Sequence, residues 1–370
     1  MPFSSLPPEL VHQVIESTVP SSFHTKTYED RQKTICQLSL VSRQFRSFAQ
    51  PLLIEIARIK SNDQLKLLLR DYSKVVSREL ILEMWGCLSS KFVGETIGGA
   101  SNLRDLTMCT DYDAMIDLSV LSSCPNLVNL RLSGGGFDAD SLDMLPSLQT
   151  LSLNFRSAEK VPELLNPRKV PALKALGLEN IDRSNELEKL KSTRIDKLLP
   201  QVDALCVEFA LYRLTRDSLL ANFEPRTLVT TRASEHLSST AESLSTVQHL
   251  RIEICNYIVR RGRLEAIQAV SQTLKSDQQS KSRQLRSIYL DPDVQPVSSD
   301  TEEVHQEFLK LEEECKLTGV DLVFEMESQH YYYDSYIPRE FCRRQRKFRE
   351  EEQSKQVSSL EGRNLRDSEA

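Results

Sequence analysis

The residues whose spacing most resembles a chemical motif are Gly134, Gly136 and Ala139, in the order G-x-G-x-x-A. This spacing is typical of a turn that holds a dinucleotide pyrophosphate between a strand and a helix. Asp138 and Asp140 stand where the pyrophosphate would approach, and two carboxylates would repel it. We therefore interpret the segment as a turn between two structural units and keep nucleotide binding as an alternative.

Side chains that hold metals or act as nucleophiles are present but are not grouped. The six histidines include no H-E-x-x-H motif and no close pairing with cysteine: His12, His24, His236, His249, His305 and His330. Isolated acidic pairs such as Asp111 and Asp113 are more typical of solvated loops than of metal ligands. The sequence contains no G-x-S-x-G elbow, P-loop or EF-hand loop. We expect no catalytic residue, no metal and no cofactor.

Eight cysteines are scattered along the chain without a C-x-x-C pair: Cys36, Cys87, Cys109, Cys124, Cys206, Cys255, Cys315 and Cys342. This distribution is typical of reduced thiols in a cytosolic protein and not of a disulfide framework. We expect these thiols to lie in the core.

Composition and charge are those of a folded protein with no strong electrostatic preference. Hydrophobic residues make up 39% and charged residues 27% of the 370 residues, with a formal net charge of -6. This balance does not favour nucleic acid as a partner. The N-terminus lacks the pattern of a signal peptide, and no apolar run approaches the roughly 18 residues that would span a bilayer. We expect a cytoplasmic or nuclear protein without membrane insertion.

A block of the form L-x-x-L-x-L recurs along the middle of the chain. Its clearest copies are Leu103, Leu106 and Met108; Leu127, Leu130 and Leu132; Leu148, Leu151 and Leu153; and Leu173, Leu176 and Leu178. They are 24, 21 and 25 residues apart, as in leucine-rich repeats. Looser copies begin at Val202, Val247 and Leu285, at spacings of 29, 45 and 38, and an earlier one includes Leu80 and Leu82. We predict a parallel strand at each block, in a solenoid whose repeats cover one another.

A proline stands two residues before the first apolar position of four successive blocks, at Pro125, Pro146, Pro171 and Pro200. Proline cannot continue a helix or donate to a sheet ladder. It is compatible with the end of one return segment and the first residue of the next strand. The regular placement of these prolines supports the repeat interpretation.

Side chains alternate along a strand, so the third, fifth and seventh positions of each block lie opposite the fourth and sixth. We predict that this opposite face is an exposed inner surface. Geometry nominates the following residues there as contacts for a protein target: Asp105, Thr107, Asn129, Arg131, Thr150, Ser152, Asn154, Glu179, Glu208, Arg251, Glu253 and Tyr289. They mix charge signs and sizes, so they do not identify the target.

Parallel strands need crossover segments between them, and residues 138–145 and 184–199 have the length and pattern of helices on the outer side. Near the C-terminus, residues 299–302 resemble a capping box. A helix would follow, with one apolar face and a stop at Gly319. That face would consist of Val304, Phe308, Leu311 and Cys315. A last strand over 320–326 would close the stack.

The first 55 residues have a helical pattern instead. Pro7 and Pro8 suit the start of a helix. The first apolar stripe consists of Leu10, Val11, Val14 and Ile15. The second stripe consists of Ile35, Leu38, Val41, Phe45 and Phe48. We expect its helix to end at Gln50, because Pro51 disfavours helix in the preceding residue. So small a unit cannot bury all of this apolar surface, and part of it should be a docking surface.

At these residues the chain resembles the F-box family. The resemblance rests on three segments between residues 5 and 55: Leu6-Pro7-x-Glu9-Leu10 with Ile15, Leu38-x-x-Val41-Ser42-Arg43-x-Phe45, and Ala49-x-Pro51-Leu52-Leu53. An F-box followed by leucine-rich repeats is similar to the substrate receptors of SCF-type cullin-RING ubiquitin ligases. There the F-box binds a small adaptor, and through it a cullin, while the repeats bind the substrate. By position, the resemblance implies adaptor contacts at Leu6, Pro7, Leu10, Ile15, Leu38, Val41 and Phe45.

The sequence thus predicts three parts: a helical head over 1–58, a repeat solenoid with a C-terminal cap over 59–326, and a Tyr/Arg-rich extension over 327–370 that is disordered towards its end. The extension has an aromatic cluster that would cover the last repeat or contact a partner: Tyr331, Tyr332, Tyr333 and Tyr336. It also has a basic run of Arg339, Arg343, Arg344, Arg346, Lys347 and Arg349. Three glutamates follow this run and favour a solvated helix over a nuclear-targeting signal.

The predicted fold class is α/β: a short all-helical, F-box-like head followed by a leucine-rich-repeat solenoid with a curved parallel sheet. The predicted function is non-catalytic, as the substrate-recognition subunit of an SCF-type ubiquitin ligase. Its expected partners are the adaptor, the cullin and an unknown protein substrate, with no membrane or nucleic acid. Three alternatives remain: a repeat scaffold without a ligase role, an enzyme that uses the glycine turn, and a nuclear or nucleic-acid-associated protein that acts through the basic run.

Overall fold

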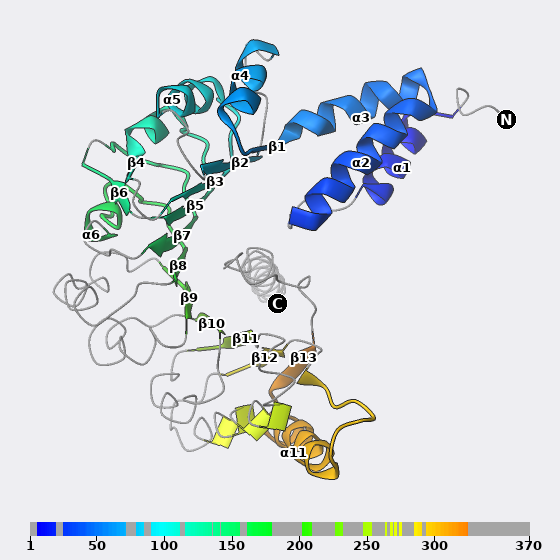
Figure 1. Ribbon diagram of the computed structural model, residues 1–370. Coiled ribbons are helices and arrows are strands. Elements are labelled where there is room, and N and C mark those ends of the chain that lie inside the picture. Colours follow the sequence, from blue (N-terminus) through cyan, green and yellow to red (C-terminus); the bar gives the residue numbers. More distant parts are fainter. Residues whose placement is uncertain are drawn as a thin grey trace, which may run out of the picture. The chain divides into compact units, whose positions relative to one another are not determined.

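A computed structural model of the chain forms a mixed α/β protein with a largely parallel sheet (Figure 1), which confirms the predicted class. It divides into two compact units, the first built mainly on residues 1–173 and the second mainly on residues 202–327. The structure describes residues 6–19, 25–71, 79–84, 90–111, 115–134, 136–140, 142–155, 161–179, 202–208, 226–231, 247–253, 263–264, 267–268, 270–271, 274–275, 285–290 and 294–324. The extension over 327–370 lies outside these residues.

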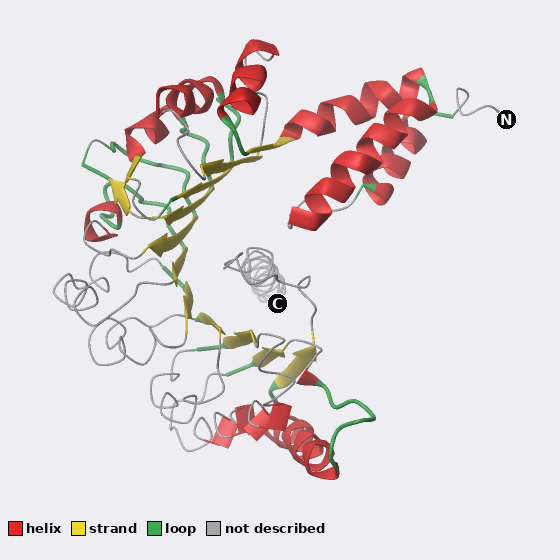
Figure 2. Ribbon diagram, in the orientation of Figure 1, coloured by secondary structure: helices red, strands yellow, loops and turns green. Residues whose placement is uncertain are grey.

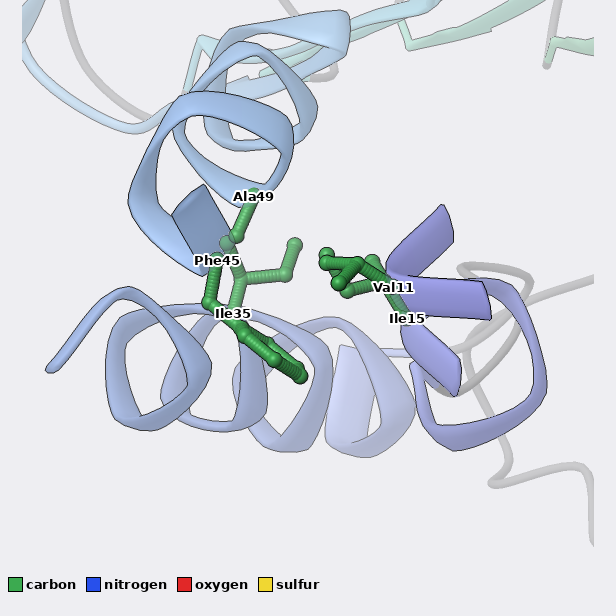
Figure 3. Packing of buried hydrophobic residues seen from close by; sticks show 5 residues of the cluster. All are labelled: Val11, Ile15, Ile35, Phe45 and Ala49. Atoms are coloured by element: carbon green, nitrogen blue, oxygen red, sulfur yellow. The ribbon is translucent and has the colours of Figure 1, made fainter. Parts of the chain in front are cut away.

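The first unit begins with three helices, which we call the helical head: α1 (Pro8–Thr18), α2 (Thr25–Val41) and α3 (Arg43–Glu55). The core of the head consists of Val11, Ile15, Ile35, Phe45 and Ala49, all at most 3% exposed (Figure 3). One side chain or more from each helix enters this cluster. Val11 and Ile15 of the first predicted stripe meet Ile35 and Phe45 of the second in this core. The second stripe does not lie on one helix as predicted but is divided between α2 and α3, and Leu10, Val14 and Val41 of the two stripes stay exposed.

Helix α3 does not end at Gln50 as predicted. It continues through Pro51 to Glu55. Its first turn is capped by the Ser42 hydroxyl, which accepts a hydrogen bond from the Phe45 N–H at 3.2 Å. Leu52 and Leu53, beyond the proline, pack against the core of the head. This burial offsets the backbone hydrogen bond that proline removes, a cost of about 3 kcal/mol in a helix interior.

The strands of the first unit run parallel, and each neighbour in the sheet is the next long strand along the chain: β1 (Ile56–Ile59), β2 (Glu79–Met84), β3 (Asp105–Thr110), β5 (Asn129–Gly134) and β7 (Thr150–Phe155). The register pairs Ile56 with Glu79, Glu79 with Asp105, Asp105 with Asn129 and Asn129 with Thr150. These offsets of 23, 26, 24 and 21 residues extend the predicted spacing one strand upstream, to β1.

The second unit repeats this arrangement with β9 (Ala204–Glu208), β10 (Thr227–Thr231), β11 (His249–Glu253), β12 (Ser287–Leu290) and β13 (Asp321–Phe324). The residues of β8 (Ala175–Glu179) are divided between the two units. Strand β10 was not predicted. Ala204 pairs with Thr227 and Thr227 with His249, so the apparent interval of 45 residues consists of two ordinary offsets, 23 and 22.

The apolar positions of the L-x-x-L-x-L blocks form the core of the sheet layer. In the four clearest blocks, every one of these side chains is at most 2% exposed. Burial of one such side chain stabilises the fold by roughly 1.5 to 3 kcal/mol, but only while the neighbouring strand covers it. The alternation predicted from the sequence is therefore confirmed for the core face.

The prolines between blocks lie in turns and not at the first residue of a strand. The N–H of Leu127 donates to the carbonyl of Cys124, which places Pro125 at the second position of a turn. The same bond joins Leu148 to Leu145 around Pro146, and Leu173 to Val170 around Pro171. Proline is favoured there because its fixed φ matches that position. Pro200 lies outside the described residues.

The segments between the first-unit strands include α4 (Asn62–Asp71), α5 (Ser90–Gly99), the 3-10 helix η2 (Leu118–Ser123) and α6 (Val161–Leu164). Figure 2 shows α4 and α5 on one side of the neighbouring strands. The predicted helix over 138–145 is wrong, because β6 (Gly136–Asp138) pairs there with β4 (Met115–Asp117) and no helix follows among the described residues up to Leu145. The predicted helix over 184–199 lies outside the described residues.

The second unit ends with α11 (Glu302–Thr318) followed by β13. Val304, Phe308, Leu311 and Cys315 are buried on one face of α11, as predicted. Gly319 ends the helix in the left-handed conformation at φ 67°. The N-cap is Thr301 and not Ser299 as predicted, and its side chain makes no capping hydrogen bond. The Asp300 side chain accepts a hydrogen bond from the Val297 N–H at 2.7 Å. Within the described residues, no helix has the length and apolar character to cross a membrane.

Candidate functional site

In the first unit, the sheet register aligns the nominated target-contact residues in rows across neighbouring strands. The first row contains Asp105, Asn129 and Thr150. The second row contains Thr107, Arg131 and Ser152, and the third ends at Asn154. The Asn129 side-chain amide donates a hydrogen bond to the Asp105 carboxylate. The register thus brings the first-unit nominees together on one face.

This face is less open than predicted. Arg131, Thr150 and Ser152 are 8%, 3% and 4% exposed, whereas Asp105, Thr107, Asn129 and Asn154 are half-buried. The expectation of an exposed surface is therefore wrong for the first three residues. Strands lie only about 4.8 Å apart, so a short hydroxyl side chain is shielded by the longer side chains of its row neighbours.

In the second unit, the corresponding rows include Arg251 and Tyr289, which are in register with each other. Arg251 is 4% exposed, again contrary to the prediction. Tyr289 is half-buried and packs against the buried cluster of Ala175, Ala204 and Cys206. In the row beside them, His249 Nδ1 lies 2.7 Å from the Ser287 hydroxyl. Sequence reasoning missed His249 and Ser287, although each stands at an inward strand position.

Three further nominees are known by backbone position alone. Glu179, Glu208 and Glu253 are the last residues of β8, β9 and β11. Their side chains lie outside the described parts of the chain. The strand register pairs Thr231 of β10 with Glu208 of β9 on one side and with Glu253 of β11 on the other.

The predicted adaptor contacts of the helical head differ in burial. Ile15 and Phe45 are buried in the core of the head, so they support its fold and do not face a partner in this conformation. Leu6 and Leu38 are half-buried against the same core, and Pro7 is exposed. The Leu6 carbonyl accepts a hydrogen bond from the Gln44 side chain at 3.1 Å, which attaches the chain start to α3.

The head also leaves large apolar side chains exposed. Leu10 and Val14, one turn apart on α1, are 46% and 41% exposed. Leu40 and Val41, at the end of α2, are 77% and 44% exposed. Two of these four, Leu10 and Val41, were predicted as adaptor contacts. Leu40 was missed because it stands outside the apolar stripe that packs against the core.

The head is attached to the first strand through polar contacts of α2. The Arg31 guanidinium lies 3.3 Å from the Glu55 carboxylate at the end of α3. The Tyr28 hydroxyl accepts a hydrogen bond from the Arg58 N–H of β1 at 3.3 Å. Burial raises the pKa of Tyr28. These contacts connect the α2 surface to the sheet edge.

Close packing between neighbouring strands explains why glycine stands at positions 134 and 136. Gly134 has φ 148°, and a Cβ atom there would overlap the Thr110 hydroxyl. A Cβ atom at Gly136 would lie 2.8 Å from the Met115 sulfur. The described residues after Gly136 continue as β6, so they do not form the helix start that a dinucleotide turn needs to receive a pyrophosphate.

The described thiols differ in their surroundings. Cys124, Cys206 and Cys315 are buried as predicted. Cys109 is half-buried and Cys36 on α2 is exposed, which corrects the expectation for these two residues. Burial raises the pKa of Cys124 and of Cys315 to about 11. Cys87, Cys255 and Cys342 lie outside the described residues. Within the described parts of the chain, no three His, Cys, Asp or Glu side chains are grouped as metal ligands.

Comparison with known proteins adds little to these observations. No family model matches the chain. Among solved structures, the chain is similar to a protein from Bacteroides fragilis that was a structural-genomics target, with 12% identity and a TM-score of 0.43, over 83% of this chain and 84% of that one.

Proposed function

We propose that this protein is the substrate-recognition subunit of an SCF-type cullin-RING ubiquitin ligase. In this proposal the helical head is an F-box that binds the adaptor, and the strand array is a leucine-rich-repeat solenoid that binds a protein target. The chain itself performs no catalysis. The adaptor connects it to the cullin, and other subunits transfer ubiquitin.

The observation that carries this proposal is the exposure of Leu10, Val14, Leu40 and Val41 on a head that has its own core. Exposed large apolar residues that adjoin one another, as Leu10 and Val14 do on α1, mark a surface that a partner can cover. The F-box resemblance supplies the kind of partner, because two of the four coincide with implied adaptor contacts. The contacts of Tyr28 and Arg31 would then transmit the position of the bound adaptor to the first strand.

The inner rows supply the proposed target surface. The half-buried members, Asp105, Thr107, Asn129, Asn154 and Tyr289, are the side chains that a target would contact first. The buried members, such as Arg131 and Ser152, would hold the neighbouring side chains in place. A sheet built from successive parallel strands offers a long, continuous surface of this kind.

The test is co-purification of the full chain with the adaptor from a reconstituted mixture. We expect wild type to retain the adaptor and the Leu10→Asp, Val14→Asp variant to lose it, because two charges would be placed in an apolar interface. A Leu309→Asp, Leu317→Asp variant is the matched control, since both of these leucines are exposed on α11 in the second unit. No recovery of the adaptor with wild type would favour the scaffold alternative, and equal recovery with all three proteins would contradict the assignment of this surface to the adaptor.

A further inference from the structure

Two neighbouring rows on the inner face of the first unit bring an arginine together with hydroxyl and amide side chains. Thr107 of β3, Arg131 of β5 and Ser152 of β7 are in register in one row. Two residues further along the strands, Ser133 of β5 is in register with Asn154 of β7. Strands lie about 4.8 Å apart and two residues along a strand span about 6.6 Å, so these side chains share an area of about 10 by 7 Å. We call the five residues the arginine patch.

The centre of the arginine patch is buried, whereas its margin can be reached from outside. Arg131 is 8% exposed and Ser152 is 4% exposed. Thr107, Ser133 and Asn154 are half-buried. Water therefore screens the permanent charge of Arg131 only weakly, and a ligand that contacts the margin is attracted by this charge.

The hydroxyl of Ser152 gives a separate indication of a ligand. Its oxygen is buried and has no hydrogen-bond partner within the described parts of the chain. Most buried hydroxyls in folded proteins are hydrogen-bonded, because an unpaired one has lost its bonds to water and gained none in return. A ligand oxygen bound beside Arg131 would supply the missing partner.

The charges around the patch favour an anion. Where the two rows cross β3, β5 and β7, all side chains are described, and they include the cation Arg131 but no carboxylate. Asp105 lies in the preceding row, where its carboxylate accepts a hydrogen bond from the Asn129 amide. A guanidinium carries five N–H donors, so Arg131 can bind a ligand in addition to the partners that it has in the protein.

A phosphate group matches these donors better than a carboxylate does. A carboxylate offers two oxygens, whereas a phosphate monoester offers three terminal oxygens and a charge of about -1.5 to -2 at neutral pH. The planar guanidinium binds two of these oxygens at once. The hydroxyls of Ser152, Thr107 and Ser133 occupy positions next to Arg131 in the register or along β5, and they can donate to the remaining oxygen.

We propose that the arginine patch binds a phosphate group, either as free inorganic phosphate or on a phosphorylated side chain of another protein. Arg131 neutralises the charge of the group, and Ser152 donates the hydrogen bond that it otherwise lacks. The half-buried residues of the margin complete the contacts. The proposal goes beyond the proposed function, because neither the adaptor surface nor the family resemblance specifies such a ligand.

The test is titration of the full chain with sodium phosphate at constant ionic strength, followed by the unfolding temperature. We expect the unfolding temperature of wild type to rise with phosphate, because a ligand that binds the folded state alone stabilises it. Arg131→Gln should weaken the affinity for phosphate at least tenfold. Ser152→Ala should weaken it about tenfold. Without phosphate, Ser152→Ala should unfold at the same temperature as wild type or at a higher one, because it removes an unpaired buried hydroxyl.

Arg104→Gln is the matched control, because it removes the same charge from an exposed position just before β3. It should respond to phosphate as wild type does. If Arg131→Gln does not fold, Ser152→Ala decides. No rise in wild type, or an equal rise in wild type, Arg131→Gln and Ser152→Ala, would overturn the proposal, since phosphate would then act only through its general effect on protein solvation.

A second titration with O-phospho-L-serine distinguishes the two sources of the group. Tighter binding than that of inorganic phosphate would support the patch as a site for phosphorylated side chains, and weaker binding would support it as a site for the free ion. Adaptor binding is a property of the helical head and should be the same in all of these variants. Failure of this proposal is therefore distinguishable from failure of the proposed function.

Discussion

The helical head leaves several large apolar residues exposed, whereas the strand array buries the leucines of its blocks. In the array, each leucine of a block is covered by the neighbouring strand, and Leu130, Leu151 and Leu153 are at most 1% exposed. In the head, five residues form a closed core while Leu10, Val14, Leu40 and Val41 stay exposed. The difference follows from size, since a unit of about 50 residues buries a much smaller fraction of its surface than a long array.

This difference shows which surface needs a partner. Neighbouring strands cover the block leucines of the array, so substitutions in these leucines should act on stability. The exposed residues of the head contribute little to the fold, so substitutions there should act on binding. Four predictions can sharpen or break this division.

The largest expected effect is the loss of a buried leucine in the array. Leu151→Ala should lower the free energy of unfolding by about 2 to 5 kcal/mol, because it removes buried methyl groups and leaves a cavity. Leu10→Ala, at a half-exposed site on the head, should change it by less than about 0.5 kcal/mol. Urea denaturation followed by circular dichroism measures both. Similar losses of unfolding free energy in the two variants would contradict the distinction between the head and the array.

A backbone constraint in the array should come next. Gly134→Ala should destabilise the first unit by about 2 kcal/mol, because alanine is strained at φ 148° and its Cβ would overlap the Thr110 hydroxyl. Gly94→Ala is the matched control: it lies within α5, its added Cβ would be 3.4 Å from the nearest atom, and it should stabilise the protein by about 0.5 to 1 kcal/mol. Thermal unfolding shifts of the same sign in both variants would contradict this account of the turn.

A smaller effect is expected at the cap of α3 in the head. Ser42→Ala removes the hydroxyl that accepts from the Phe45 N–H and should cost about 1 kcal/mol. Ser47→Ala, whose exposed hydroxyl donates to the Gln44 carbonyl, should be close to neutral. Amide exchange of the first turn of α3 reports the loss locally. If Ser47→Ala were the more destabilising change, the boundary of α3 would need revision.

The last prediction concerns the rate at which thiols are labelled. It compares the head and the array without any substitution. At pH 8, Cys36 on the head should react readily with iodoacetamide because it is exposed. Cys124 in the array should react slowly, because it is buried and its pKa is raised to about 11, so that little thiolate is present. Its reaction should accelerate as the pH approaches 11. Peptide mapping distinguishes the two thiols. Equal labelling of Cys36 and Cys124 at pH 8 would contradict the burial of Cys124 in the array.

Much of the array could be predicted from the sequence, because its strands repeat a leucine pattern that also fixes which face is buried. Strand β10 was missed because Thr230 stands where neighbouring blocks have Val207 and Ile252. The run Thr227-Leu228-Val229-Thr230-Thr231, in which four of five residues are β-branched, stands one ordinary interval after β9 and was the available signal. The helix over 138–145 was predicted from the length and polar–apolar pattern of the segment, and no sequence pattern specified the pairing of β4 with β6.

The candidate site was predictable in position but not in accessibility. Strand alternation placed Arg131, Ser152 and Arg251 on the inner face, and the register aligns them with their neighbours. Their burial depends on side chains from adjacent strands, which a single repeat does not reveal. In the head, the family resemblance did not separate Ile15 and Phe45, which form the core, from Leu10 and Val41, which are exposed.

The affinity of the full chain for the adaptor tests the central claim most directly. Isothermal titration calorimetry should give tight binding with wild type, and Leu10→Asp should weaken it at least tenfold while leaving the unfolding temperature unchanged, because Leu10 lies outside the core of the head. No measurable binding by wild type, or unaltered affinity after Leu10→Asp, would contradict the assignment of this surface of the head to an adaptor.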